Sequence, residues 1–438
     1  MITDRENLPP MLNMDPTRQP VLDAHRCGWA WALRALEPLH DRNGVLFDSF
    51  LERSFCWFAR QEMRYRRIPY REPWVGILHN PPGVPIWHDY QNSPQEMLRS
   101  QAFQDSLDFC CGLFVLSKYL RDWLANQVNV PVAALIHPTE TQVPQFDFAA
   151  YERQTRRRVV QVGWWLRKLT SIYRLPARRM EKAMLCIGHG YFAQVLERER
   201  KVFPVAARQF ETVKHIDFLN NELYDALLSQ SIVFCDLFDS SANNTVIECI
   251  ARATPLLVNP LPAVLEYLGD EYPFYFASLE EAAVKAEDLD LVHKTHRYLA
   301  NLDKTRFQQQ HFREELAASA VYQQLPEASR TRQQVICGPD RHLNARFCDP
   351  VLGPIESEIS VMRSPSGQVI VGNVVVKISD GVLSSQLSNL ANQELRGKRI
   401  MDALRIVEDG FLKHCECPST HLRKRLASSF QEALSSFR

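Results

Sequence analysis

The chain has no excess of charge of either sign. Its 438 residues include 51 basic and 51 acidic side chains, which cancel. No global field therefore draws the protein to nucleic acid or to an anionic membrane. We interpret the densest basic run, Arg156–Arg158, as a solvated linker face. The sequence predicts no nucleic-acid partner.

Long apolar runs are also missing. Every apolar run is far shorter than the ~20 residues that a helix needs to span a bilayer. Residues 1–14 are polar and lack a basic segment followed by an apolar one, so we expect no secretory signal. The sequence therefore predicts no integral membrane segment.

The eleven cysteines do not form a disulfide framework. They are scattered, and several lie inside apolar runs, as Cys110, Cys186 and Cys235 do. This is typical of buried free thiols in a reducing compartment, and it predicts a cytoplasmic protein. The cluster His414–Cys417 is too cramped for zinc, which prefers two to four residues between paired cysteines.

Apolar strands alternate with helical segments from about residue 71. Trp74–Leu78, Cys111–Leu116 and Val130–Ile136 read as buried strands, and Ser117 is placed to cap the helix that follows the second of them. Alternation of this kind indicates βαβ units and a parallel sheet. We predict a Rossmann-like domain over residues 1–150.

A second βαβ series begins after a charged segment, residues 144–158, which we interpret as a linker. Its predicted strands are Val159–Gly163, Ala183–Gly188, Thr212–Ile216, Ser231–Cys235 and Pro255–Val258. We predict a second Rossmann-like domain over residues 151–330. Two such domains create a cleft, and ligands bind at the carboxyl ends of the strands.

The pattern changes beyond residue 330. Residues 357–387 alternate like β-structure around a hairpin turn at Ser364–Gly367, and residues 393–438 have a helical pattern. We predict a separate α+β appendage over residues 331–438, of unknown role.

Small polar residues follow the predicted strand Ser231–Cys235 and open a helix. The free N–H groups at such a helix start can bind phosphate. Glu248 lies one turn into this helix, on the same face as Asn244, and one carboxylate can bind both hydroxyls of a ribose. The alternative is an ordinary capped helix with a solvent-facing Glu248.

Residues 231–268 resemble the donor-binding segment of the family-4 glycosyltransferases, retaining enzymes of the GT-B fold. The matching residues are Ile232–Cys235, Glu248-Cys249, Ala253–Val258 and Glu266–Leu268. The resemblance extends over about residues 71 to 325. It implies an α/β protein of GT-B type, with two Rossmann-like domains that face each other across a cleft.

The resemblance also implies roles for individual residues. Arg167-Lys168 are similar to the family's basic groups at the diphosphate, and His79 to a histidine that faces the donor sugar. The implied catalytic residues are His79, Arg167, Lys168 and Glu248. The implied donor-binding residues are Gly163, Arg167, Lys168, Phe218, Leu219, Asn243, Asn244, Thr245 and Glu248.

Two positions depart from the family's pattern. Ser240 stands where the family usually has its first Glu, and Asn243 lies near the place of a loop glycine. The family's mechanism implies that the leaving diphosphate accepts the proton, so the protein positions the reactants and stabilises charge. No Asp-x-Asp pair stands in the right place, so we expect no cofactor and no obligatory metal.

These observations predict a glycosyltransferase, similar to hexosyltransferases, that moves a sugar from a UDP- or GDP-type donor with retention. The acceptor, whether a glycan, a protein or a small molecule, is not readable. One alternative is a non-catalytic GT-B-like binding protein that lost the first donor-site Glu. A GT-B epimerase or an inverting transferase is another, and self-association into a homo-oligomer stays open.

Overall fold

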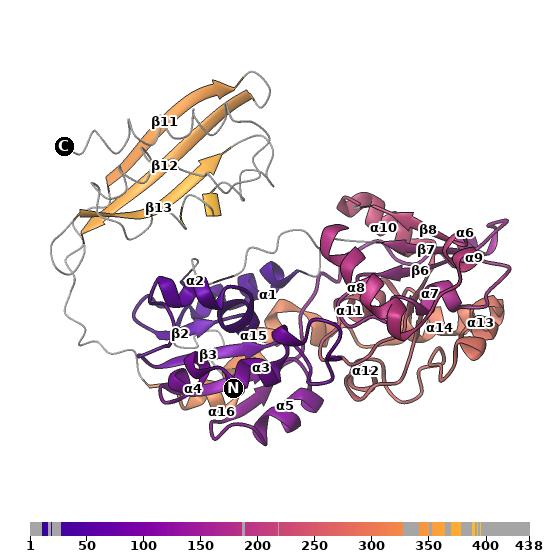
Figure 1. Ribbon diagram of the computed structural model, residues 1–438, viewed down its shortest axis with the longest axis horizontal. Helices are drawn as coiled ribbons and strands as arrows, with labels where there is room; N and C mark the ends of the chain where they lie inside the picture. The colour runs from indigo at the N-terminus through magenta and orange to yellow at the C-terminus, as the bar shows by residue number, and fades with distance from the viewer. Residues whose placement is uncertain are drawn as a thin grey trace, which may run out of the picture. The chain divides into compact units, whose positions relative to one another are not determined.

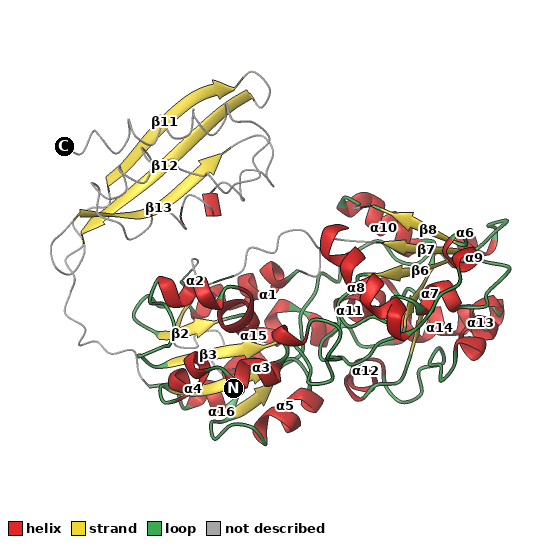
Figure 2. Cartoon of the chain, in the orientation of Figure 1, coloured by secondary structure: helices red, strands yellow, loops and turns green. Residues whose placement is uncertain are grey.

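The computed structural model describes residues 11–15, 19, 28–185, 189–217 and 219–326, three strands between 341 and 377, and residues 388, 389, 392 and 395. The chain divides into two compact units, Met1–Ser329 and Arg330–Arg438. Figures 1 and 2 show their helices and strands.

The first sheet of the larger unit is parallel throughout. Its order is β1 (Leu12–Asn13), β2 (Val45–Asp48), β3 (Trp74–Leu78), β4 (Cys110–Val115) and β5 (Val132–Ala134). All residues of β2 and β3 are buried, as expected for a parallel sheet covered on both faces. The helical segments are α1 (Trp29–Leu36), η1 (Glu37–Leu39), η2 (Arg53–Trp57), α2 (Ala59–Arg64), η3 (Tyr90–Asn92), α3 (Pro94–Arg99), α4 (Gln101–Leu107) and α5 (Lys118–Ala125).

The second sheet is parallel too, in the order β10-β9-β6-β7-β8. Its strands are β6 (Arg158–Val162), β7 (Glu181–Leu185), β8 (Val213–Ile216), β9 (Ile232–Cys235) and β10 (Leu256–Val258). Its helical segments are α6 (Phe148–Glu152), α7 (Ser171–Arg174), α8 (His189–Val202), α9 (Ala207–Phe210), α10 (Asn221–Ser229), α11 (Asn244–Arg252), α12 (Pro262–Leu268), α13 (Leu279–Glu287), α14 (Leu289–Asn301) and η4 (Thr305–Phe307). The order reverses between β6 and β9, the kind of point at which such sheets bind ligands.

These two sheets confirm the predicted α/β fold of two Rossmann-like domains. The chain then returns to the first domain through α15 (Gln309–Ala318) and α16 (Ala320–Gln323). Phe312 and Val321 are buried in one core cluster with Phe47 and Phe114 of the first sheet. Helices from the end of the unit, which the division at residue 150 does not anticipate, therefore complete the core of the first domain.

The smaller unit contains an antiparallel sheet. Strands β11 (Arg341–Asp349), β12 (Gly353–Arg363) and β13 (Val369–Lys377) pair in chain order. The predicted turn at Ser364–Gly367 and most of the predicted helical region 393–438 lie outside the described residues. Within the part of the chain that the structure describes, no helix has the length and apolar character needed to cross a membrane.

Candidate functional site

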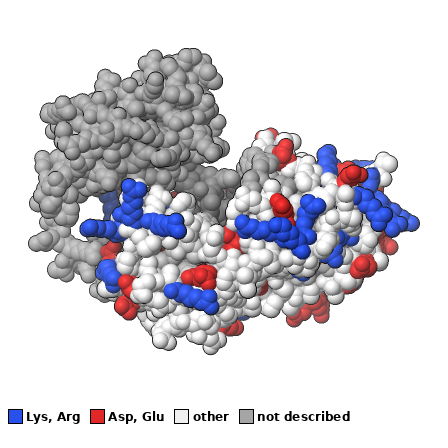
Figure 3. Space-filling model, in the orientation of Figure 1, with Lys and Arg blue, Asp and Glu red and all other residues white. Residues whose placement is uncertain are grey.

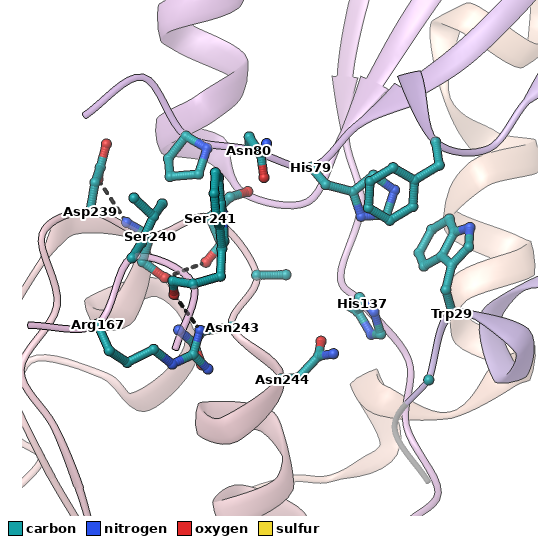
Figure 4. A pocket seen from close by; sticks show the side chains of 16 residues that line it. Trp29, His79, Asn80, His137, Arg167, Asp239, Ser240, Ser241, Asn243 and Asn244 are labelled. Atoms are coloured by element: carbon teal, nitrogen blue, oxygen red, sulfur yellow. Dashed lines mark hydrogen bonds between the residues drawn. The ribbon is translucent and has the colours of Figure 1, made fainter. Parts of the chain in front are cut away.

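A cavity of about 270 Å³ lies where the two Rossmann-like domains face each other (Figure 4). Its walls are Gly28, Trp29, Phe50, His79–Pro81 and His137 of the first domain, and Trp165–Arg167 and Asp239–Asn244 of the second. Most of these segments follow directly after β3, β5, β6 and β9. The cavity is therefore built at the carboxyl edges of both sheets, where the fold is expected to place a ligand.

Arg167 enters the cavity from the loop after β6. Its Nη2 group donates to Asn243 Oδ1 at 3.0 Å and to Thr245 Oγ1 at 2.9 Å, and its Nη1 group donates to the Trp165 carbonyl at 2.6 Å. The side chain is buried, and it is the one Lys or Arg among the cavity-lining residues that the structure describes. These contacts hold a cation against the start of α11.

Gly163 makes the turn that allows this arrangement. Its φ is +75°, in the region that favours glycine, and a Cβ atom here would lie 3.4 Å from the Arg167 guanidinium. The next loop residue with positive φ is Leu166, at 55°. The loop therefore turns sharply between β6 and Arg167.

The first turn of α11 forms the opposite part of this wall. Asn243 is the N-cap, and its side-chain oxygen accepts a hydrogen bond from the Thr245 N–H at 3.1 Å. Asn244 lines the cavity beside it (Figure 4). The positive end of the helix dipole and the Arg167 guanidinium thus favour an anion at the same place. The structure brings the predicted residues Gly163, Arg167, Asn243, Asn244 and Thr245 together.

Lys168 does not line this cavity. Its Nζ pairs with Asp236 Oδ1 at 2.7 Å, and its backbone N–H donates to the Asp236 carbonyl at 2.7 Å. Ser171 Oγ donates to the other carboxylate oxygen of Asp236 at 2.7 Å. In this structure Lys168 therefore anchors the loop after β6 to the end of β9.

Glu248 is buried one turn into α11, with 3% of its surface exposed. Its Oε2 accepts a hydrogen bond from the Tyr224 hydroxyl of α10. The carboxylate is not part of the cavity wall, and it is not the solvent-facing group of the capped-helix alternative. Leu219 packs against the core of the second domain, and Phe218 lies outside the described residues.

His79 lies in the first-domain wall, held by aromatic neighbours. Its ring stacks on Phe50 at 3.9 Å between centroids and meets Trp29 edge-on at 4.4 Å. Its Nε2 is 2.9 Å from the Ser49 carbonyl, which assigns the proton to that nitrogen. Burial lowers the pKa of His79 to about 3, so the ring is neutral near pH 7 and cannot supply a positive charge to a ligand.

Glu52 is a site residue that the sequence analysis missed. Its Oε1 accepts hydrogen bonds from the backbone N–H groups of His79, at 2.8 Å, and Asn80, at 2.5 Å. Burial raises the pKa of Glu52 to about 7. This carboxyl fixes the turn that carries His79 and Asn80 into the cavity. The strand before it, β2, was not predicted, so nothing in the sequence pointed to Glu52.

Carboxylates of the second domain also join the two domains. Asp239 Oδ2 accepts from the Gly83 N–H at 2.6 Å and from the Tyr119 hydroxyl at 3.1 Å. Glu266 accepts from the Lys118 and Tyr119 N–H groups at the start of α5, both at 2.7 Å. These contacts fix the two walls of the cavity relative to each other.

Ser240, the departure from the family's pattern, lies in the cavity wall. Its hydroxyl donates to the Ser241 carbonyl at 2.9 Å. A small hydroxyl, and no carboxylate, therefore lies at this position of the cavity wall. Among the described residues, no group of three or more His, Cys, Asp or Glu side chains could hold a metal ion. The His414–Cys417 cluster lies outside them.

No family model and no curated protein sequence matches the chain. Solved structures that it resembles include HepE of Anabaena in complex with UDP-glucose, at 10% identity and a TM-score of 0.46, covering 62% of this chain and 77% of that one. Sucrose-phosphate synthase of Thermosynechococcus elongatus, at 13% identity, gives a TM-score of 0.48 and covers 68% and 76%. At these values the likeness carries no argument about function, which rests on the chain's own geometry.

Proposed function

We propose that this protein transfers a sugar from a UDP- or GDP-type nucleotide-sugar donor to an acceptor, with retention at the sugar carbon. The cavity between the two domains carries the proposal, because Arg167 and the start of α11 meet there. A diphosphate requires a cation and helix N–H groups of this kind in a place shielded from water.

In this proposal the diphosphate lies against Arg167, Asn243 and Thr245, and the sugar lies toward His79. The groups around the sugar are then Asn80 and Ser240, which can bind hydroxyls. The ribose would extend along the first turn of α11, whose buried Glu248 carboxylate is held by the Tyr224 hydroxyl and lies outside the cavity wall. Lys168 keeps the loop after β6 in position through Asp236.

Retention is supported by what the cavity offers as a base. Asp239 is the one carboxylate among the described cavity-lining residues, and its oxygens accept from Gly83, Tyr119 and its neighbour Ser240. Burial raises the pKa of Asp239, but these donors occupy its oxygens, so it is not free to take the proton of an acceptor hydroxyl. Burial lowers the pKa of the cavity histidines His79 and His137 to about 3 and about 4, so both are weak bases. In the proposed step the sugar–oxygen bond to the diphosphate breaks, the acceptor oxygen bonds to the same sugar carbon, and the leaving diphosphate takes the acceptor proton.

The direct test incubates the full chain with a panel of nucleotide sugars and a panel of simple acceptors. We expect one donor to release its nucleoside diphosphate, detected with a coupled enzyme assay. The same diphosphate should raise the free energy of unfolding by about 2.7 kcal/mol at a hundredfold excess over its Kd.

The two readouts separate the possible failures. A melting shift without any released diphosphate would support the non-catalytic binding protein instead. No release and no melting shift with uridine, guanosine or adenosine diphosphates at millimolar concentration would contradict the proposal.

A further inference from the structure

Exposed apolar side chains gather on one short segment of the first domain. Among the described residues, Trp57 is 45% exposed, Phe58 40% and Met63 46%. All three lie on η2, on α2 or between them. Transfer of exposed tryptophan, phenylalanine and methionine side chains from water to an apolar phase is favourable. A cluster of such side chains therefore marks an interaction surface.

Arginines alternate with these apolar side chains. Arg60, Arg64 and Arg66 are exposed, and none of their guanidinium groups forms an ion pair within the part of the chain that the structure describes. Figure 3 shows one group of Lys and Arg side chains over α2 and others over the second domain. The surface, defined as residues 57–66, therefore combines apolar groups with positive charge that no described carboxylate neutralises.

The single acidic residue between Arg53 and Arg71 does not oppose this charge. Glu62 is buried, and its Oε1 lies 3.4 Å from both Arg53 Nη1 and Arg67 Nη1. One carboxylate thus faces inward toward two guanidinium groups. The outward face keeps its arginines without an acidic neighbour from its own segment.

The surface is anchored to the core and adjoins the cavity. Phe55, two residues before it in η2, is buried in a core cluster with Tyr70 and Trp74. The Trp57 ring lies 4.8 Å from the Phe50 ring, and Phe50 lines the cavity and stacks on His79. The surface is therefore continuous with the first-domain wall of the cavity.

We propose that residues 57–66 bind an anionic membrane surface. The apolar side chains would enter the boundary between headgroups and acyl chains, and the arginines would bind lipid phosphates. This composition, apolar and aromatic groups interleaved with Arg and lacking exposed acids, complements negatively charged lipids. Because the chain's net charge is zero, attraction to the membrane arises from this local surface rather than from a global field.

The test is flotation of the full chain with lipid vesicles, without any nucleotide. One vesicle set contains phosphatidylcholine alone, and in the other about a third of the lipid is phosphatidylglycerol. We expect the protein to float with the anionic vesicles only, and to be released at high salt, because salt screens exposed charges. Nucleotide is absent, so the outcome is independent of the proposed transferase activity.

Variants locate the binding surface. Each arginine near an anionic surface strengthens binding about fivefold, so the triple change Arg60→Glu, Arg64→Glu and Arg66→Glu should weaken it by about a hundredfold or more. The matched control reverses three exposed charges of the second domain, through Arg178→Glu, Lys201→Glu and Arg208→Glu. It has the same net charge and should bind vesicles like the wild type.

The pair Trp57→Ser and Phe58→Ser tests the apolar contribution and should weaken vesicle binding at least about tenfold. Equal binding to both vesicle sets, or equal loss in the triple variant and its control, would overturn the proposal. The proposal would also be overturned if the wild type did not bind vesicles but formed a dimer that these serine variants abolish. If the triple variant does not fold by circular dichroism, the lipid and salt dependence of the wild type still decides.

Discussion

Replacing Arg167 with alanine is expected to weaken binding of the donor's nucleoside diphosphate by about ten- to hundredfold, while the nucleoside alone binds unchanged. Hydrogen bonds to a charged group contribute about 1.5–3 kcal/mol, which corresponds to this range. Arg167 is buried beside Asn243 and Thr245, so its charge meets a phosphate with little screening. Isothermal titration with diphosphate and nucleoside measures the difference.

Two further variants make this result specific. Arg167→Lys keeps the charge but loses the fork of donors, so its diphosphate affinity should lie between those of the wild type and the alanine variant. Arg174→Ala removes an exposed cation from α7 and should leave the diphosphate affinity unchanged. If the diphosphate Kd of Arg167→Ala were within twofold of the wild-type value, the diphosphate would not bind at this wall of the cavity.

Replacing Arg252 with alanine should lower the free energy of unfolding by about 3–5 kcal/mol. Arg252 ends α11, and its Nη2 lies 2.7 Å from Asp225 Oδ1 of α10, with side-chain exposures of 1% and 5%. Removing the cation leaves a buried carboxylate without its ion-pair partner, which is costly because the interior solvates charge poorly. Urea denaturation followed by far-UV circular dichroism measures the change.

The control for Arg252 is an exposed ion pair. Arg121 Nη2 lies 2.7 Å from Asp122 Oδ1, and the two side chains are 38% and 67% exposed. Arg121→Ala should change the free energy of unfolding by no more than about 1 kcal/mol. The double change Arg252→Met with Asp225→Leu should recover part of the loss, since it removes the Asp225 charge with the cation but leaves the buried Glu248 carboxylate near Arg252 in place. A loss below 1 kcal/mol in Arg252→Ala would show that Asp225 is solvated or paired elsewhere.

Much of the fold follows from apolar runs alone. The predicted strand Trp74–Leu78 is β3, with the same bounds, and each strand of the second sheet lies within or close to its predicted run. A strand buried on both faces of a parallel sheet is apolar throughout, so its sequence marks it. In contrast, β1 and β2 span two and four residues and were not predicted. The two residues of β1 are too few to carry a pattern, and β2 precedes the regular alternation of strands and helices that begins at about residue 71.

The sequence also does not reveal that α15 and α16 pack back onto the first domain. The helices α15 and α16 have ordinary apolar faces, and nothing local indicates which sheet they cover. Their partners, such as Phe47 and Phe114, lie roughly 200 to 270 residues earlier in the sequence. Periodicity identifies the buried face of a helix but not the surface against which it packs.

The sequence indicates those candidate-site residues whose positions follow from the order of strands and helices, but not those whose positions depend on side-chain packing. Gly163, Arg167 and Asn243 lie at ends of strands or starts of helices, and the topology of the sheet brings those positions together. The contacts of Lys168 with Asp236 and of Glu248 with Tyr224 depend on side-chain packing between elements. These pairings separate the anchoring residues from the cavity wall, and no spacing in the sequence encodes them.

Hydrogen–deuterium exchange of the full chain, with and without the donor's nucleoside diphosphate, tests the placement of the donor most directly. The cavity geometry predicts slower amide exchange in residues 162–168, which contain Arg167, and in residues 239–248, which open α11. Amides in β11–β13 should exchange at unchanged rates. Unchanged exchange in both cavity segments at millimolar diphosphate, or protection confined to other parts of the chain, would contradict the account.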